Sequence, residues 1–413
     1  MPRVERLARP VSLVLILCCT CGTLILGGAL KAPCATGQWG DGRQYRRLCY
    51  SDIVPLLSTE QLAGGRLPFL QPCLETGGQC DEYPVLTMYF MRVAAWIGGS
   101  TSGGFFTANA ILLWICAAVT VTFLYMLGTK AIWFALAPTL LVYAFMNWDL
   151  FAVALATGAL VAFARRHDGT AGMLLGLGAA AKFYPAMLLL PLIAQRLQDR
   201  EPDAAIRLGW TTAGTWLLVN APFAIASPSG WWTFFRFNSA RPADWDSLWY
   251  IGCAHVHAAA VCGHTSRLNA LSVVLFAGSF GLVWFLKRRR DPGFARWALA
   301  FPLIVLFLVF NKVYSPQYGL WLLPLFALSS LDVRAFLAFE AADVAVFVTR
   351  FSFFGHLTGI GGLPFGAFET AIAVRTLVLL WCVGSWLRRP APPVPELTPS
   401  GIDVRVAAAG ARA

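Results

Sequence analysis

Long apolar segments alternate with short polar or basic stretches along most of this 413-residue chain. A helix that crosses the hydrocarbon of a bilayer needs about 20 apolar residues, and shorter helices serve where neighbours support them. Such segments recur from residue 11 to residue 387, and the pattern predicts twelve crossings. The predicted spans cover residues 11–30, 105–127, 131–146, 148–164, 170–182, 184–197, 206–228, 267–287, 295–311, 317–331, 333–353 and 366–387.

Two apolar segments need a separate interpretation. The first, "VSLVLILCCTCGTLILGGAL" (residues 11–30), is longer than the apolar core of about 7–15 residues in a signal peptide, so we interpret it as a retained helix. The second, "PVLTMYFMRVAAWIGG" (residues 84–99), is short and carries Arg92. We expect it to lie on the outer membrane face. If it crosses instead, the sidedness of every segment up to the next ambiguous hairpin is reversed.

Basic residues indicate which side of the membrane each loop faces, because they favour cytoplasmic span ends. Arg3, Arg6 and Arg9 precede the first span, which places residues 31–104 outside. The same threading puts these basic groups inside: Lys130, Arg165, Arg166, Arg196, Arg200, Lys287 to Arg290, Arg334, Arg388 and Arg389. Both termini are then cytoplasmic, and residues 229–266 form a second outer loop.

Composition agrees with a membrane protein and excludes a soluble domain. Hydrophobic residues make up 58% of the chain and charged residues 13%, and the mean hydropathy is +0.63. The net charge of +11 lies mostly at predicted cytoplasmic span ends beside anionic lipid, so it does not indicate nucleic-acid binding. We predict one all-α membrane domain over residues 1–387. The Pro- and Ala-rich segment 388–413 is predicted to be a disordered cytoplasmic tail.

Six of the eleven cysteines fall in the two predicted outer loops, on the side of the membrane where disulfides persist. The close pairs Cys73/Cys80 and Cys253/Cys262 can each close a small loop, which leaves Cys34 with Cys49. Spacing does not fix the connectivity, and free thiols are the alternative.

Polar residues gather at the predicted outer ends of the spans. The first outer loop contains "CYSD" (residues 49–52) and "DEYP" (residues 81–84). A single loop Asp is usually a solvated charge, but several other outer ends are polar too. They read "NWD" (147–149), "KFYP" (182–185), "NKVYSPQY" (311–318) and "WWTFFRFNSARPADWDSLWY" (231–250). The polar residues at these other span ends favour the interpretation that the Asp52 carboxylate is positioned in a site.

Lys182 lies between apolar residues and has no evident counter-ion in the sequence, as is also true of Lys312. A charge at this depth costs several kcal/mol unless it is paired or snorkels to the interface, and snorkelling is the simpler interpretation. Pro185 breaks the helix, however, and broken backbone at membrane depth is tolerated where it lines a cavity or is buried in protein. We therefore expect both lysines to reach one outer-facing cavity and bind an anion. Together with the acids of the first loop and a lipid-accessible wall, they suit a reaction whose donor is a membrane lipid that carries a phosphate.

Five segments carry a family resemblance across residues 45–330: "CYSDIVPLL", "EYPVLTMYF", "NWDLFAVALA", "GLGAAAKFYPAMLLLPL" and "NKVYSPQYGLWLLPL". In this order they resemble the polyprenol-phosphate-dependent membrane glycosyltransferases of the GT-C type. The resemblance is strongest to glycosyltransferase family 87, the actinobacterial alpha-mannosyltransferase-like proteins. It implies a multi-span helical bundle in the plasma membrane, whose large first extracytoplasmic loop carries juxtamembrane helices.

The resemblance also implies a mechanism. An acidic residue of the first outer loop acts as general base in GT-C enzymes, and Asp52 matches that position. It would deprotonate an acceptor hydroxyl, which attacks the anomeric carbon of a sugar on polyprenyl phosphate; the phosphate leaves and the configuration inverts. Lys312 and Lys182 would bind that phosphate, with Arg241 in reserve. The implied substrate-binding residues are Glu82, Tyr83, Asn147, Asp149, Lys182, Tyr184, Arg241, Lys312, Tyr314 and Gln317.

Several alternatives stay open. Asp81 and Glu82 rival Asp52 as the base. The histidines of the second outer loop are a weak ligand signal, so we expect a reaction without metal or cofactor. The predicted activity is transfer of a hexose, with mannose first, to an envelope lipid or glycan. A transporter or lipid-linked sugar flippase is the alternative, since these also use broken helices and membrane-depth charges, although we find no internal repeat.

Overall fold

A computed structural model describes residues 11–74, 80–256 and 259–395, and all regular structure within these ranges is helical. In chain order the elements are α1 (Leu13–Lys31), η1 (Ala32–Cys34), α2 (Arg43–Arg46), α3 (Ile53–Thr59), α4 (Val85–Gly98), α5 (Ser102–Met126), α6 (Ala131–Ala135), α7 (Pro138–Tyr143), α8 (Asp149–Ala164), α9 (Asp168–Ala181), α10 (Tyr184–Met187), α11 (Leu189–Gln198), α12 (Pro202–Ala226), α13 (Pro228–Ala240), α14 (Leu248–Val256), α15 (Ala259–Cys262), α16 (Thr265–Arg290), η3 (Arg296–Leu299), α17 (Ala300–Phe310), η4 (Pro316–Tyr318), α18 (Gly319–Leu328), α19 (Val333–Leu357) and α20 (Phe365–Arg388).

Four helices of the described chain are long and apolar enough to cross a membrane: α1, α5, α16 and α20. Large apolar side chains cover their outer faces; Ile25, Val274 and Leu377 are each more than 60% exposed. Such exposure is expected where lipid is the solvent. The protein is therefore an all-helical membrane protein, as the hydropathy pattern predicts. The twelve-crossing threading stays a prediction.

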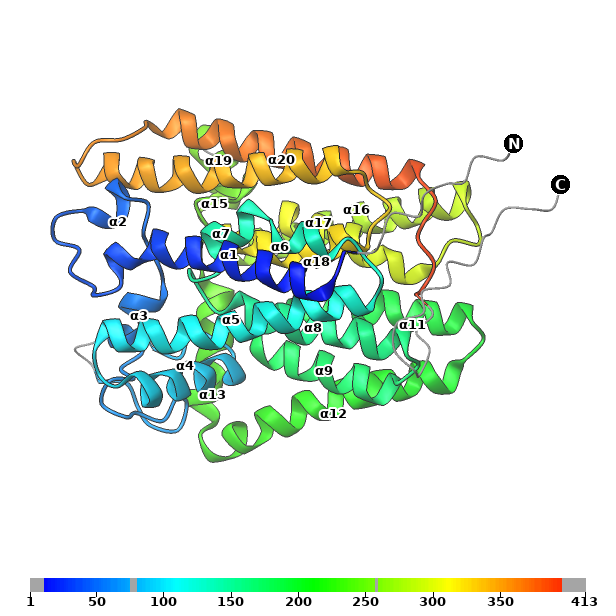
Figure 1. Ribbon diagram of the computed structural model, residues 1–413, viewed down its shortest axis with the longest axis horizontal. Coiled ribbons are helices and arrows are strands. Elements are labelled where there is room, and N and C mark those ends of the chain that lie inside the picture. The colour runs from blue at the N-terminus through cyan, green and yellow to red at the C-terminus, as the bar shows by residue number, and fades with distance from the viewer. Residues whose placement is uncertain (1–10, 75–79, 257–258, 396–413) are drawn as a thin grey trace.

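The basic segments gather at one end of the bundle. There Lys130 Nζ donates to the Leu331 carbonyl at 2.6 Å, and Arg389 pairs with Asp332 at 2.7 Å. Figure 1 shows α2 and α3 at the opposite end of the bundle from α11.

Two predicted spans are interrupted helices. Residues 131–146 form α6 and α7, and residues 184–197 form α10 and α11. Pro138 lies in the first turn of α7, and Pro185 lies in the first turn of α10. In a first turn the backbone N–H has no partner within the helix, so proline is tolerated there. At the start of α7 the Thr139 N–H donates to the Glu340 carboxylate at 2.7 Å, and both residues are buried.

Helix α4 packs into the bundle against α5 and α9 (Figure 1). Thr87 Oγ1 donates to the Ala181 carbonyl at 2.7 Å, and Met88 is fully buried, whereas Trp96 on the other face is 77% exposed. A Cβ atom on Gly98 would lie 2.2 Å from the Gly104 carbonyl oxygen, so the α4–α5 hairpin requires glycine there. The helix expected on the outer membrane face therefore has one side inside the protein.

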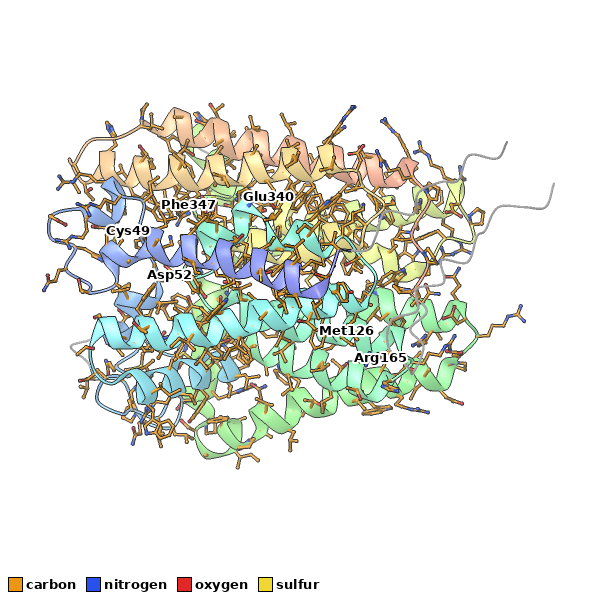
Figure 2. All side chains as sticks on the ribbon, viewed as in Figure 1. Cys49, Asp52, Met126, Arg165, Glu340 and Phe347 are labelled. Carbon is orange, nitrogen blue, oxygen red and sulfur yellow. A yellow bond between two sulfur atoms is a disulfide. The ribbon has the colours of Figure 1, made fainter. Side chains whose placement is uncertain are left out.

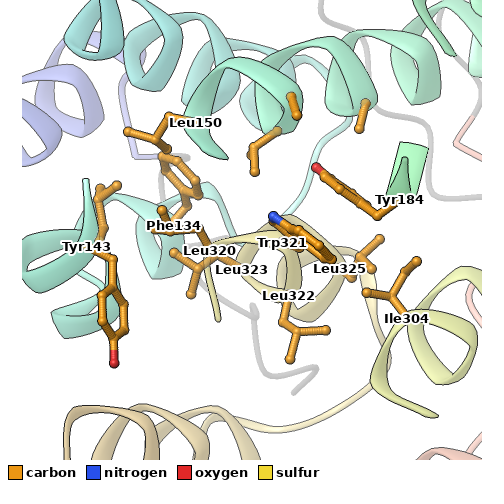
Figure 3. Packing of buried hydrophobic residues seen from close by; sticks show 14 of the residues in the cluster. Phe134, Tyr143, Leu150, Tyr184, Ile304, Leu320, Trp321, Leu322, Leu323 and Leu325 are labelled. Atoms are coloured by element: carbon orange, nitrogen blue, oxygen red, sulfur yellow. The ribbon is translucent and has the colours of Figure 1, made fainter. Parts of the chain in front are cut away.

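The core centres on α18, whose residues from Gly319 to Ala327 are all buried. A helix that is apolar all round belongs in an interior. Figure 3 shows Trp321 of α18 beside Tyr184 of α10, and their ring centroids are 4.3 Å apart. Tyr184 and Trp321 both line the cavity described below, so the core is continuous with the cavity wall.

All three predicted disulfides are present, joining Cys34 to Cys49, Cys73 to Cys80 and Cys253 to Cys262. The tail was expected to leave the bundle at residue 388. Instead, the described residues 389–395 stay in contact with it, because Trp297 Nε1 donates to the Pro392 carbonyl at 2.9 Å. The rest of the predicted tail and the basic residues before residue 11 lie outside the described residues.

Candidate active site

A cavity of about 730 Å³ collects most of the residues expected at a substrate site. It is lined by segments from the first outer loop, the α9–α10 break, α13 and the loop after it, α16, and residues 311–321. Eight sequence-predicted residues line it: Asp52, Glu82, Tyr83, Lys182, Tyr184, Arg241, Lys312 and Gln317. Tertiary structure thus joins residues that lie up to 265 positions apart in the chain.

The "CYSD" stretch is fastened to the end of α1. Cys49 is disulfide-bonded to Cys34 just after that helix, and Lys31 Nζ donates to the Tyr50 carbonyl at 2.7 Å. Lys31 is only 1% exposed, so its ammonium group is committed to this contact. The stretch therefore enters the cavity on a fixed path.

Two further hydrogen bonds fix the backbone at the acid itself. Ser51 Oγ donates to the Phe145 carbonyl at 2.7 Å, and the Asp52 N–H donates to the Met146 carbonyl at 2.9 Å. Figure 2 shows Cys49 and Asp52 toward one end of the bundle, with Met126 and Arg165 toward the other. Asp52 then ends the loop, and α3 begins at the next residue.

The Asp52 carboxylate accepts hydrogen bonds from two side-chain amides. Asn147 Nδ2 lies 2.9 Å from Asp52 Oδ2, and Gln317 Nε2 lies 3.4 Å from the same oxygen. Asn147 Nδ2 also donates to the Tyr83 hydroxyl at 2.7 Å. Asn147 does not line the cavity and acts on it through Asp52 and Tyr83. The two amides therefore hold the Asp52 carboxylate in one orientation, as a positioned general base requires.

Tyr50 lies beside the acid and lines the cavity, although the sequence did not single it out as a site residue. The negative charge of Asp52, followed by burial, raises the pKa of Tyr50 well above its usual value. The phenol therefore stays protonated at neutral pH and can donate a hydrogen bond.

Asp81, one of the two rival acids, is occupied elsewhere. Its Oδ1 lies 2.7 Å from Arg66 Nη2, its Oδ2 accepts from the Phe69 N–H, and the residue is 4% exposed. It does not line the cavity. The structure therefore leaves two acids at the cavity, Asp52 and Glu82.

Glu82 faces the cavity from a turn that a third acid organises. The Glu60 carboxylate accepts from the N–H groups of Asp81 at 2.6 Å and Glu82 at 3.3 Å. Burial raises the pKa of Glu82, while the charge of Arg241 opposes that shift. Glu82 thus differs from Asp52 in having no side-chain amide donor among the hydrogen bonds of the described chain.

Lys182 has a counter-ion, which corrects the expectation drawn from the sequence. Its Nζ lies 3.0 Å from Asp149 Oδ1, and both side chains are buried. Asp149 also accepts from Trp321 Nε1 at 2.7 Å, and it does not itself line the cavity. The ammonium group is 5.1 Å from the Tyr318 ring centroid. Asp149 therefore balances the Lys182 charge before any ligand enters.

Lys312 and Arg241 lie beside each other in the cavity lining. Lys312 Nζ donates to the Ser239 carbonyl at 3.1 Å and to the Arg241 carbonyl, and no carboxylate of the described chain lies within ion-pair distance of it. Burial, followed by the charge of Arg241, lowers the pKa of Lys312 to about 8. Arg241 pairs with Asp244 at 3.2 Å. Two neighbouring cations with one carboxylate between them favour an anionic ligand.

Tyr314 lies away from the cavity lining, against the Arg375 guanidinium, which is 3.7 Å from its ring centroid. Tyr318 and Trp321 line the cavity where Tyr314 was expected to do so. Their ring centroids are 4.0 Å apart, and Trp321 also stacks on Tyr184. Asn269 was also missed. It is a polar residue in the apolar span α16, which is itself a signal for a functional position.

One group of metal-ligand side chains occurs within the described ranges, formed by Cys73, Cys80 and Asp81. Its two sulfurs are joined in a disulfide and Asp81 pairs with Arg66, so the group offers no thiolate. The residues present do not fit a metal site there. A reaction without metal stays a prediction.

Residues 82–311 match the family model described as glycosyltransferase family 87, which is more than half of the chain. Glu82, Lys182 and Arg241 lie within the matched residues, whereas Asp52, Lys312 and the helices α19 and α20 lie outside them. A comparison with curated proteins finds no match.

Proposed function

The chain belongs to glycosyltransferase family 87, and we propose that it transfers a hexose from a polyprenyl-phosphate sugar to a lipid or glycan of the cell envelope, with inversion at the anomeric carbon. Mannose is our first candidate for the sugar. Family membership disfavours the alternative of a transporter or a lipid-linked sugar flippase.

One observation carries the proposal: a single cavity holds the acids Asp52 and Glu82 and the cations Lys312 and Arg241. Glycosyl transfer from a phosphate donor needs both, because a base must take the acceptor proton and cations must receive the charge that develops on the leaving phosphate. A site for neutral sugars alone would need no cation.

Asp52 is the proposed base. Its carboxylate takes the proton of the acceptor hydroxyl as that oxygen bonds to the anomeric carbon, and the bond from that carbon to the phosphate oxygen breaks with its electron pair leaving on phosphate. Asn147 and Gln317 hold the carboxylate for this step. Glu82 has no such support and is the second candidate.

Lys312 and Arg241 are the proposed phosphate ligands. Lys312 donates only to backbone carbonyls in the described chain, so a phosphate would supply a charge partner that it lacks. Lys182 contributes less, since Asp149 already neutralises it. Tyr83, Tyr184 and the Tyr318–Trp321 pair would then border the sugar.

We also propose that the cavity opens on the extracytoplasmic side of the plasma membrane and that the chain crosses twelve times. The clustering of basic turns at the far end of the bundle supports this sidedness, as do the disulfides on the cavity side. The helix α13 lies beside the cavity with Phe234, Phe235 and Phe237 in its lining. Such an apolar wall suits a prenyl chain.

The direct test is transfer by purified protein in lipid vesicles. Polyprenyl-phosphate mannose and extracted envelope lipids would be supplied, and labelled product would be separated from donor. Product formation with release of polyprenyl phosphate supports the proposal. Passage of donor across the vesicle membrane without product supports the flippase instead. Glycans of a deletion strain, compared with the parent, would identify the acceptor as the one that shortens.

A further inference from the structure

The loops that carry Arg241 and Lys312 are tied together. We call residues 239–247 and 311–315 the cation loops. The Asp244 N–H donates to the Lys312 carbonyl at 2.8 Å, and Ser315 Oγ donates to Asp244 Oδ2 at 3.2 Å. With the bond from Lys312 Nζ to Ser239, these contacts make the two cations one unit.

Arg375 of α20 contacts both cation loops from a fully buried position. Its Nη2 donates to the Asp246 carbonyl at 3.1 Å, and its guanidinium lies 3.7 Å from the ring centroid of Tyr314. Asp343 of α19 balances the charge, with its Oδ1 3.3 Å from Arg375 Nη1. Arg375 does not line the cavity, so it cannot act as a ligand in this arrangement.

The neighbouring helix α19 reaches the acid side of the site as well. Arg350 pairs with the Asp246 carboxylate, and the adjacent Phe351 ring stacks on Tyr50 with centroids 5.1 Å apart. Tyr50 stands two residues before Asp52 in the stretch fastened to α1. The packed pair α19–α20 therefore touches both the base side and the cation side.

We propose that Arg375 is a positioning residue: it holds the cation loops on α19 and α20 and thereby sets where Lys312 and Arg241 stand relative to Asp52. This inference rests on the proposed function for its effect on transfer, but the loop contacts can be tested without it. A displacement of about 1 Å at a reacting centre can reduce rate by about 100-fold, so a residue outside the cavity can matter this much.

A purely structural role for a buried Arg–Asp pair is the competing explanation, and the chain provides a matched control. Arg196 pairs with Asp168 at 2.8 Å, both side chains are at most 5% exposed, and the pair lies at the opposite end of the bundle. The neutral double variant Arg375→Gln/Asp343→Asn would be compared with Arg196→Gln/Asp168→Asn. Both remove one buried ion pair, and the first leaves no member of its pair charged. In the control, Asp199 and Glu201 stay ionised 3.7 and 3.9 Å from the former Arg196 Nη1, but both are partly exposed and keep solvent contact.

We expect the first double variant to raise the donor KM and lower kcat/KM by about tenfold or more with the acceptor KM unchanged. The control should leave the ratio of donor to acceptor KM at its parental value. Arg375→Lys, which keeps the charge but loses the planar guanidinium, should fall between the parent and the double variant. If the double variant does not fold, the same kinetic comparison is made with Arg375→Lys. Equal changes in both KM values, or the same change in the control, would overturn the positioning role.

Hydrogen exchange of the full-length protein gives a readout independent of any substrate. Peptides covering the cation loops should exchange faster in Arg375→Gln/Asp343→Asn, whereas the peptide with the Asp52 N–H should not change. Unaltered exchange in the cation loops would overturn the inference. The two proposals can also be separated. If the parent protein transfers no sugar from polyprenyl phosphate, the proposed function is refuted. If the cation loops of the double variant still exchange faster, the role of Arg375 in holding those loops is retained.

Discussion

Asn147 and Asp52 share a hydrogen bond of 2.9 Å although 95 residues separate them in the chain. The same amide nitrogen also lies 2.7 Å from the Tyr83 hydroxyl. One side chain at the start of α8 therefore links the acid of the first outer loop to the turn that carries Glu82. This contact favours Asp52 over Glu82 as the base, because it orients the carboxylate.

Asp52→Asn should abolish transfer, because the amide keeps the shape of the side chain and loses its basic oxygen. A positioned general base contributes about 100-fold or more, so kcat should fall at least that far. Glu82→Gln is the matched control and should retain a larger share of the rate. Membrane insertion and thermal unfolding of both variants would be measured beside the transfer assay. A rate above about a tenth of the parental value in Asp52→Asn would assign the base to Glu82.

Donor affinity should depend on pH through Lys312. Its pKa is lowered to about 8, so the side chain is charged below that pH and becomes neutral as the pH rises through it. If the charged form binds phosphate, donor KM should rise between about pH 7 and pH 9 while acceptor KM stays level. Lys312→Arg should remove this dependence, because arginine stays charged. The idea fails if the arginine variant and the parent give the same profile.

Lys182 and Asp149 should behave as a structural pair. Removing one partner of a buried ion pair destabilises a protein by about 3–5 kcal/mol, since it leaves an uncompensated charge. Asp149→Asn should therefore lower the thermal unfolding temperature, and Asp149→Asn/Lys182→Gln should recover part of the loss. Lys312→Ala is the comparison: it should reduce donor use with little effect on unfolding. Recovery of stability in the double variant is the decisive measurement.

Sidedness can be tested with single cysteines in a variant that lacks the native ones. Gln38 and Asp203 are both exposed, on the cavity side and the basic side of the bundle respectively. Gln38→Cys should react with a membrane-impermeant thiol reagent in intact cells, and Asp203→Cys only after permeabilisation. Ser51 and Ser247 also lie in the predicted outer loops, but each is at most 1% exposed, so a cysteine there would not be accessible to the thiol reagent. The reverse labelling pattern would place the cavity in the cytoplasm and contradict the proposed donor.

Hydropathy and charge along the chain were enough to predict an all-helical membrane protein, and the family resemblance supplied the eight predicted residues that line the cavity. These properties are local: an apolar segment must be helical in lipid, and a polar group at its end must be satisfied there. Proximity in the sequence suggested the three disulfide pairs but did not fix them, because free thiols remained the alternative. The break at Pro185 was predicted from that proline, whereas the break before Pro138 inside residues 131–146 was not.

Only the tertiary structure decided which partner each charged residue has. Asp149 pairs with Lys182, which lies 33 positions away in the chain. Arg66 pairs with Asp81, so Asp81 is not available as the base. Tyr314 packs against Arg375 and does not line the cavity. The sequence states the charge of a side chain, but the energy of a buried charge depends on what lies within a few ångströms of it. Those neighbours come from helices distant in the chain, so their identity is fixed by packing.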